Sequence, residues 1–154
     1  MITKAVIAGL FMLAAVGVRH SAPRADQDAR PAGSVWDGVF TEEQARRGQA
    51  LYSRECAVCH GSDMAGADEV PALSGPTFLA NWDGLTMNDL FERIRVSMPP
   101  NKQGRLSRQQ IADLLSHVLK ANGFPAGKAE LDSKAEMLKQ IRIVATKPAS
   151  SASK

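Results

Sequence analysis

The residues best suited to chemistry lie in one short stretch, "CAVCH", from Cys56 to His60. The chain has only two cysteines, three positions apart, and one of its three histidines follows the second directly. Two thiols at this spacing can each add to a vinyl group of one haem, and the adjacent histidine can then bind the iron through a neutral imidazole nitrogen. The pattern therefore predicts one haem c attached through Cys56 and Cys59, with His60 as an iron ligand.

Other cysteine chemistry explains less of this stretch. A disulfide or a thiol exchange pair gains nothing from the histidine, and exchange pairs of the thioredoxin kind lie in βαβ units, for which the chain has no strand pattern. A zinc site needs four ligands, and the sequence has no second cluster of Cys and His. Disulfide formation and thiol exchange remain the alternatives to haem attachment.

Two capping-box spacings mark the starts of helices. Thr41 is followed three residues later by Gln44, and Ser107 by Gln110, so that each pair can satisfy backbone N–H groups reciprocally. The first pair predicts a helix to about residue 55, directly before the cysteines. The second predicts a helix that ends near residue 122, before a glycine.

Two further helices complete the expected framework. One starts near Thr86 and the other, a short one, at Ser133, while strand signals are lacking. We therefore expect a small all-α fold. The residues expected on the core side of the four helices are Ala45, Leu51, Tyr52, Leu90, Phe91, Ile94, Ile111, Leu114, Leu115, Val118, Leu119, Met137, Leu138 and Ile141.

The beginning of the chain reads as an export signal, which places the protein in the periplasm. Lys4 precedes a 14-residue apolar stretch, residues 5–18, and small residues follow. The alternative is a membrane anchor, but 14 residues are fewer than the roughly 18 to 20 that span a bilayer, so no stable span is expected after cleavage. The predicted organisation is a cleaved signal and start of a linker (1–25), a polar linker (26–34), the domain (35–127), a basic C-terminal extension with a short helix (128–144) and a disordered tail (145–154).

The charge balance does not favour a nucleic-acid partner. Three of the 19 basic residues precede Asp26, which leaves 16 basic and 16 acidic residues in the remainder. No basic run with interleaved aromatic residues occurs either. We therefore expect no binding to nucleic acid.

Four segments together resemble a known family. They are "RRGQALYSRECAVCHGSDMAG", "VPALSG", "FLANWDGLTMNDLFERIRVSMPP" and "LSRQQIADLLSHVLKANGFPAG". The resemblance is to the monohaem class I cytochromes c, and in particular to the small haem domains that accompany bacterial quinoprotein (PQQ) dehydrogenases. It covers residues 35–127 and implies the class I cytochrome c fold, in which three to five short helices surround one covalently bound haem c.

The resemblance implies that Met98 is the second iron ligand. Met98 lies at a helix end, and the two prolines after it keep the chain extended. In the family a Met-Pro at this place supplies the distal thioether. Met64, four residues past His60, is too close in the chain to reach the opposite face easily. His117, on a predicted helix, is the rival ligand.

The same resemblance implies roles for two residues near the ligands. The family uses the carbonyl of a proline in a "P-x-L" segment to accept the second ring N–H of the ligand histidine, which points to Pro71. Trp82 would line the haem pocket and donate its indole N–H to a haem propionate. A plain turn at Pro71 and ordinary core packing of Trp82 are the alternatives.

Ligation by histidine and methionine predicts an electron carrier and not an enzyme, because it leaves no open position on the iron. The resemblance implies redox protein partners, with a quinoprotein-type dehydrogenase as donor and an oxidase or another cytochrome as acceptor. A tightly bound cytochrome subunit of a dehydrogenase complex is one alternative. A haem enzyme or sensor is another, if Met98 does not bind the iron.

A run of positive charge surrounds Met98. Residues 93–108 contain five basic side chains and no acidic one. Such a cluster beside an exposed haem edge would steer an acidic partner, and the alternative is an ordinary solvated face. The five residues are Arg93, Arg95, Lys102, Arg105 and Arg108.

Overall fold

The computed structural model describes residues 33–148, and within them the fold is all-α, as predicted. The predicted signal, nearly all of the predicted linker and the last six residues lie outside the described part. No helix of the described part is long and apolar enough to cross a membrane. The elements are a 3-10 helix η1 (Val35–Asp37) and the α-helices α1 (Glu42–Glu55), α2 (Ala57–His60), α3 (Gly75–Trp82), α4 (Met87–Ser97), α5 (Arg108–Ala121) and α6 (Ala135–Leu138).

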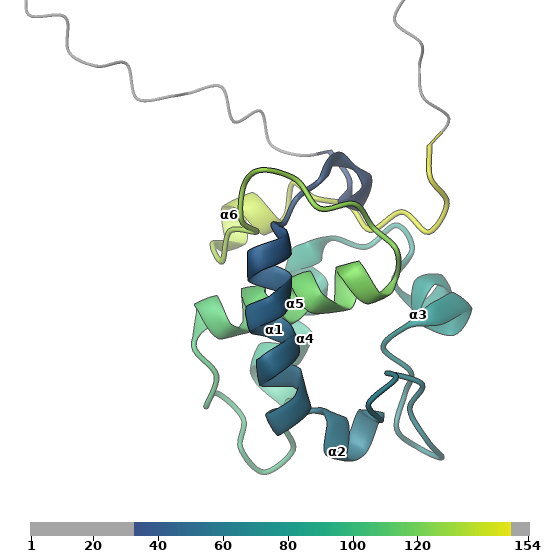
Figure 1. The fold of residues 1–154 in the computed structure, drawn as a ribbon, viewed down its shortest axis with the longest axis vertical. Helices are drawn as coiled ribbons and strands as arrows, with labels where there is room; N and C mark the ends of the chain where they lie inside the picture. The colour runs from purple at the N-terminus through teal and green to yellow at the C-terminus, as the bar shows by residue number, and fades with distance from the viewer. Residues whose placement is uncertain (1–32, 149–154) are drawn as a thin grey trace, which may run out of the picture.

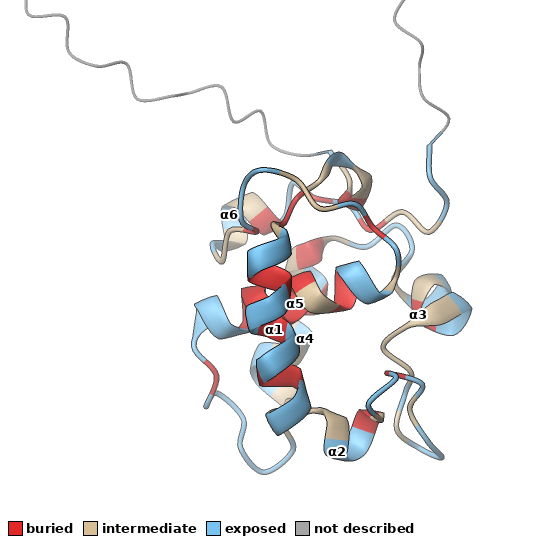
Figure 2. Ribbon diagram, viewed as in Figure 1, coloured by how far each residue is buried: buried red, intermediate tan, exposed pale blue. Residues whose placement is uncertain are grey.

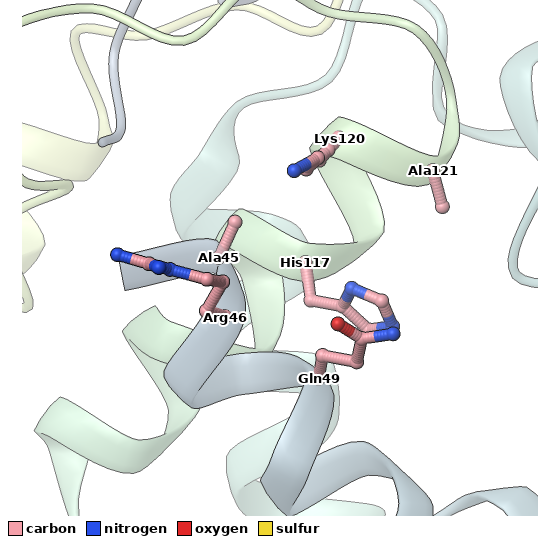
Figure 3. Close-up of a pocket in the computed structure, with 6 residues that line it drawn as sticks. All are labelled: Ala45, Arg46, Gln49, His117, Lys120 and Ala121. Atoms are coloured by element: carbon pink, nitrogen blue, oxygen red, sulfur yellow. The ribbon is translucent and has the colours of Figure 1, made fainter. Parts of the chain in front are cut away.

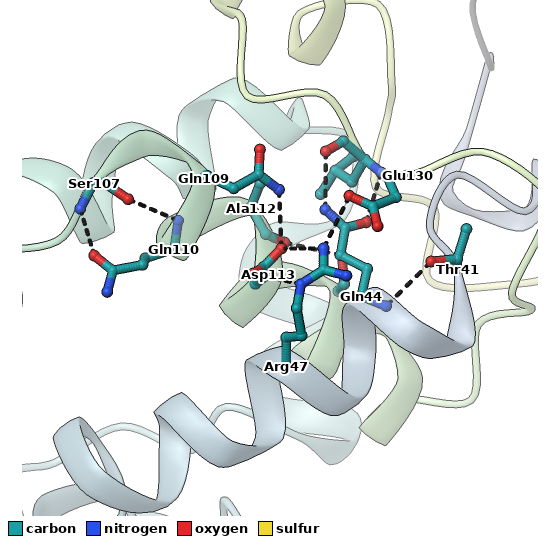
Figure 4. Close-up of polar contacts among 11 residues, drawn as sticks. Thr41, Gln44, Arg47, Ser107, Gln109, Gln110, Ala112, Asp113 and Glu130 are labelled. Atoms are coloured by element: carbon teal, nitrogen blue, oxygen red, sulfur yellow. Dashed lines mark hydrogen bonds and ion pairs between the residues drawn. The ribbon is translucent and has the colours of Figure 1, made fainter.

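Helices α1 and α5 cross at the centre of the molecule (Figure 1). Their backbones meet at Gly48, where a Cβ atom would lie 1.8 Å from the carbonyl oxygen of Asp113. Only glycine permits this approach. Near the crossing, Arg47 donates to both carboxylate oxygens of Asp113, at 3.1 and 3.0 Å (Figure 4). The predicted apolar stripe of α5 is buried, as Ile111, Leu114, Leu115, Val118 and Leu119.

One of the two predicted capping boxes is complete and the other is half formed. Ser107 and Gln110 bond reciprocally, at 3.2 and 2.8 Å (Figure 4). Thr41 accepts from the backbone N–H of Gln44 at 3.1 Å, but the side chain of Gln44 does not bond back. Instead this fully buried amide bonds the backbone N–H and C=O of Leu131, at 2.7 and 3.0 Å. Bridging two otherwise unpaired buried backbone groups outweighs completing a cap at the helix start.

The segment set apart as a C-terminal extension packs into the domain. Its buried residues join the same core as α1, α4 and α5. Its backbone also bonds the start of α4, through Ile141 to Met87 at 2.9 Å and through Ile143 to Leu85 at 2.8 Å. Helix α6 begins at Ala135, two residues later than predicted. The buried residues of the segment are Leu131, Leu138, Ile141 and Ile143.

The first residues of the predicted disordered tail are held as well. The backbone N–H of Ala145 donates to the carboxylate of Asp83 at 2.8 Å, and the indole N–H of Trp36 donates to the carbonyl of Val144 at 2.8 Å. Low-complexity composition alone suggested disorder, whereas Ala145 bonds Asp83 and Lys147 lies over the ring of Trp36. Residues 149–154 lie outside the described part of the chain.

Burial is unevenly distributed over the molecule (Figure 2). The α1–α5 crossing, the apolar side of α4 and the C-terminal segment carry most of the buried side chains. By contrast, residues 53–63 contribute only His60, and residues 92–105 contribute none. These two poorly buried stretches are the ones that carry the predicted ligands.

Candidate cofactor site

Helix α2 presents both cysteines. The chain breaks between α1 and α2 at Cys56, which has φ −122° and ψ −39°, and the next four residues form a single helical turn that ends at His60. Cys56 is half-buried and Cys59 exposed, and both are free thiols. The N-cap and the third residue of α2 therefore supply two separate thiol groups close in the chain to a buried imidazole.

The thiol of Cys56 is a poor nucleophile at neutral pH. Burial raises its pKa to about 11, with smaller contributions from the negative charges of Glu55 and Cys59. Thiol exchange proteins need the opposite, a cysteine whose pKa is lowered so that the thiolate is populated. The environment of Cys56 therefore differs from that of the attacking cysteine in such proteins.

His60 is buried and held by one ring nitrogen. Its Nδ1 lies 2.9 Å from the carbonyl oxygen of Pro71, a contact in which the nitrogen donates. A proton fixed on Nδ1 leaves the lone pair on Nε2, the nitrogen that can bind a metal. Nε2 takes no part in the hydrogen bonds found within residues 33–148. The structure thus brings His60 and Pro71 together, while their roles toward haem remain predictions.

The loop from Gly61 to Ser74 carries Pro71 back to His60. The backbone N–H of Gly66 donates to the carbonyl of His60 at 3.0 Å, and that of Leu73 donates to the carbonyl of Met64 at 2.8 Å. The hydroxyl of Tyr52 donates to the carbonyl of Gly61 at 2.6 Å, and burial raises the pKa of Tyr52 to about 12, which keeps it a donor. The loop is therefore held by hydrogen bonds from several sides.

Asn122 also holds this loop, and sequence reasoning missed it. Its side chain donates to the carbonyl of Leu73 at 3.0 Å and accepts from the backbone N–H of Gly75 at 3.0 Å. In the sequence, Asn122 marks only the end of the last long predicted helix. An asparagine at such a position is a common helix end, so nothing in the pattern indicates a second task.

Met98 lies where α4 ends. Its backbone is extended, with φ −124° and ψ 146°, and the side chain is only partly buried. Among the other methionines of the described part, Met64 and Met87 are buried in the core, and Met137 is half-buried on α6. The thioether of Met98 is therefore only partly enclosed by the core. No described hydrogen bond joins its segment to His60 or Pro71.

Trp82 is the last residue of α3, a helix that the sequence reasoning did not predict. It is half-buried, and its ring lies 6.3 Å from that of Phe78. This pairing is compatible with both interpretations of Trp82, and its role toward haem stays a prediction. The missed start signal is Pro76, since proline in the first turn of a helix is common.

His117 lies in a different environment from the cysteines. It lines a surface pocket of about 310 Å³ between α1 and α5 (Figure 3). Its ring lies 5.5 Å from that of Tyr52, and burial, followed by the charge of Lys120, lowers its pKa. His60 and Met98 do not line this pocket. The lining residues are Ala45, Arg46, Gln49, His117, Lys120 and Ala121.

The basic cluster around Met98 is partly neutralised, because two carboxylates pair with three of its five basic side chains. Glu92 pairs with Arg95 at 2.6 Å and with Arg108 at 3.7 Å. Glu55 pairs with Arg105 at 3.2 Å. Both acidic partners lie outside residues 93–108, so a count of charges within that range does not include them. Within the described residues only Arg93 and Lys102 of the five lack an ion pair.

The residues present fit haem c. The donor set consists of the free thiols of Cys56 and Cys59, the imidazole of His60 and the partly exposed thioether of Met98. The Nδ1 atom of the imidazole is hydrogen-bonded, which leaves Nε2 for a metal. Partly buried apolar side chains border the core on the same segments and suit a flat apolar group. No three His, Cys, Asp or Glu of the described residues form a metal site of their own. The bordering apolar residues are Ala57, Leu73, Leu79, Trp82 and Ile94.

Comparison with known proteins finds a cytochrome family and one structure of similar fold. Residues 43–118 match the protein family described as "Cytochrome C oxidase, cbb3-type, subunit III". Among solved structures, the sulfane dehydrogenase SoxCD from Paracoccus pantotrophus is similar in fold, with a TM-score of 0.50 and 20% sequence identity. The alignment covers 70% of this chain and 61% of that chain. No match was found among curated proteins.

Proposed function

Because this chain is a monohaem class I cytochrome c-like protein, we propose that it works as a periplasmic one-electron carrier with haem c bound to Cys56 and Cys59. Cytochrome c domains transfer electrons, and haem c supplies an iron that gains and loses one electron. The observation that carries the proposal is the 2.9 Å contact between His60 Nδ1 and the Pro71 carbonyl, beside two free thiols. That contact holds the proton on Nδ1 and leaves the lone pair of Nε2 available to bind iron.

Each residue of the proposed site has a separate task. Cys56 and Cys59 would hold the haem by thioether bonds, and His60 would bind the iron through Nε2. The Pro71 carbonyl fixes the tautomer of His60 and makes its free nitrogen more basic. Met98 would be the second ligand, and a thioether ligand favours ferrous iron and a fairly positive potential.

Two ligands from the chain explain why we propose a carrier. With His60 and Met98 both bound, no position is left where peroxide or oxygen could bind and react. The site would then exchange electrons without changing bonds. A haem enzyme or sensor is the function to expect if Met98 does not bind iron.

The proposed partners are redox proteins. The predicted signal and the setting of cytochrome c domains, which are generally periplasmic or extracellular, support a periplasmic location. The sequence resemblance supports transfer from a quinoprotein-type dehydrogenase to an oxidase or another cytochrome. A second candidate is a tightly bound subunit of a dehydrogenase complex. The similarity to a sulfane dehydrogenase structure favours keeping this candidate, and co-purification with a dehydrogenase would separate it from a free carrier.

Absorption spectra of haem-loaded protein test the ligand set. We expect the oxidised wild type to show a sulfur-to-iron charge-transfer band at the red end of the spectrum, and Met98→Ala to lose it. Met137→Ala, which removes a half-buried methionine of α6, should keep the band. A band that persists in Met98→Ala moves the sixth ligand elsewhere, and an open position in the wild type favours the enzyme or sensor.

A further inference from the structure

We propose that Asn122 is a positioning residue for His60, acting through the loop that contains Pro71. The clamp that Asn122 forms is a feature of the chain itself, while its effect on the iron rests on the proposed function. The inference follows from hydrogen bonds that connect the end of α5 to the acceptor of the His60 ring proton.

The side chain of Asn122 bridges two distant parts of the chain. Its Nδ2 donates to the carbonyl of Leu73 at 3.0 Å and to that of Val118 at 2.8 Å. Its Oδ1 accepts from the backbone N–H of Gly75 at 3.0 Å. One amide therefore uses both donors and its acceptor to tie the loop and the start of α3 to the last turn of α5.

The tied segment is the one that orients His60. Pro71, whose carbonyl accepts from His60 Nδ1, lies two residues before Leu73. Leu73 is also held from its other side, because its N–H donates to the carbonyl of Met64 at 2.8 Å. The N–H and the C=O of Leu73 are both hydrogen-bonded. The nearby Pro71 carbonyl therefore has little freedom to move away from the His60 ring.

The strength of the contact between His60 and Pro71 sets the basicity of the ligand nitrogen. A strong hydrogen bond from Nδ1 makes Nε2 a better donor to iron, which stabilises the ferric state relative to the ferrous state. Without the Asn122 amide, the backbone of Leu73 loses one of the two hydrogen bonds that hold it, and the contact between His60 and Pro71 weakens. The ferrous state is then favoured, so the reduction potential rises.

The chain offers a matched control in Gln44. This side chain makes the same kind of two-sided bridge, to the N–H and C=O of Leu131 at 2.7 and 3.0 Å. It is fully buried, and its partner lies in the C-terminal segment instead of the loop of Pro71. Removal of either amide should lower the resistance to denaturant, but only removal of Asn122 should alter His60.

The experiment compares full-length, haem-loaded wild type, Asn122→Ala and Gln44→Ala by redox titration and by NMR exchange of the His60 Nδ1 proton with water. For Asn122→Ala we expect the ferrous-to-ferric ratio at the wild-type midpoint to rise roughly threefold and the ring proton to exchange about tenfold faster. Gln44→Ala should leave both readouts at the wild-type value. Asn122→Ser, which can hold only one arm of the loop, should shift both readouts in the same direction but less.

Two results would overturn the proposal. One is an unchanged potential and unchanged ring-proton exchange in Asn122→Ala, or in Asn122→Ser if the alanine variant does not fold. The other is an equal shift in Gln44→Ala, which would show general loosening. A purified protein without haem would contradict the proposed function and not the clamp, since exchange of the His60 ring proton still measures the clamp in that protein.

Discussion

The molecule has two regions that are held together in different ways. The packed core consists of the buried side chains of α1, α4, α5 and residues 128–148. The ligand rim, residues 56–74 and 98–105, buries only His60 and Met64 and is shaped mainly by backbone hydrogen bonds. The three non-glycine residues with positive φ in the described part, Met64, Asp68 and Asn101, all lie in the ligand rim.

This difference shows where the free energy of folding comes from and where it is used. The packed core gains stability from apolar area removed from water, which does not depend on a cofactor. The ligand rim holds left-handed backbone, which costs of order 1 to 3 kcal/mol at such a residue and is found mostly at functional sites. We infer that the packed core maintains a rim whose geometry serves the ligands.

The largest effect should come from removing both thiols. In Cys56→Ser/Cys59→Ser we expect complete loss of covalently attached haem, because a hydroxyl does not form the thioether. Amide hydrogen exchange should then rise most in the ligand rim and least at the α1–α5 crossing. Val58→Ala, which changes the exposed residue between the cysteines, is the control. A uniform rise over the whole domain would break the comparison between the two regions.

Gly48→Ala should be the most damaging single change in the packed core. The added Cβ would lie 1.8 Å from the Asp113 carbonyl oxygen, so α1 and α5 must move apart. We expect a loss of about 3 kcal/mol or more in the free energy of unfolding, measured by denaturant titration. Gln49→Ala, at an exposed neighbouring position of α1, should change it by less than about 0.5 kcal/mol. Equal values for the two variants would contradict a tight helix crossing.

Leu138→Ala tests whether the C-terminal segment belongs to the packed core. Leu138 is fully buried, so truncation should cost about 2 to 3 kcal/mol in the free energy of unfolding. Met137→Ala, at the half-buried position beside it, should cost about 1 kcal/mol or less. If both variants unfold at the wild-type denaturant concentration, the segment is an appendage and not part of the core.

The smallest effect concerns the cap of α4 and depends on pH. Thr86 bonds the carboxylate of Asp89 through its backbone N–H at 2.8 Å and its hydroxyl at 2.7 Å. These bonds lower the pKa of Asp89 below its ordinary value of 3.8, the backbone bond contributing most. The stabilisation is therefore complete above pH 3.8 and is lost as the pH falls through the lowered pKa.

Thr86→Ala should accordingly cost about 1 kcal/mol at neutral pH, and less in acid. Ser107→Ala is the matched control, because its partner Gln110 does not titrate and its cost should stay constant with pH. Denaturant titrations of both variants and the wild type between neutral pH and pH 3 measure the difference. Parallel pH profiles for the two variants would show that Asp89 does not contribute through its charge.

Much of the packed core could be predicted from the sequence, because its signals are local. A capping residue followed by an apolar stripe placed α1 and α5, whereas the single helical turn of α2 was not predicted. Helix α3 was missed because Gly75 and Pro76 read as breakers, although here they open a helix.

The contacts between distant segments could not be predicted. Gln44 has the spacing of a capping box, yet its side chain bonds Leu131, 87 residues away. Arg105 appears in a purely basic window, yet it pairs with Glu55. Such choices depend on which backbone groups and charges the fold leaves unpaired, and that becomes visible only when the helices are assembled.

The described chain enters and leaves at the same end of the molecule. The backbone N–H of Val35 donates to the carbonyl of Arg142 at 2.9 Å, and that of Arg142 to the carbonyl of Gly33 at 3.3 Å. Helix α2 lies at the opposite end in the view of Figure 1. The domain can therefore be spliced into a host polypeptide, or fixed to an electrode through either end, with its cysteine helix still facing outward. The two ends of the described chain are thus separate from the helix that follows Cys56.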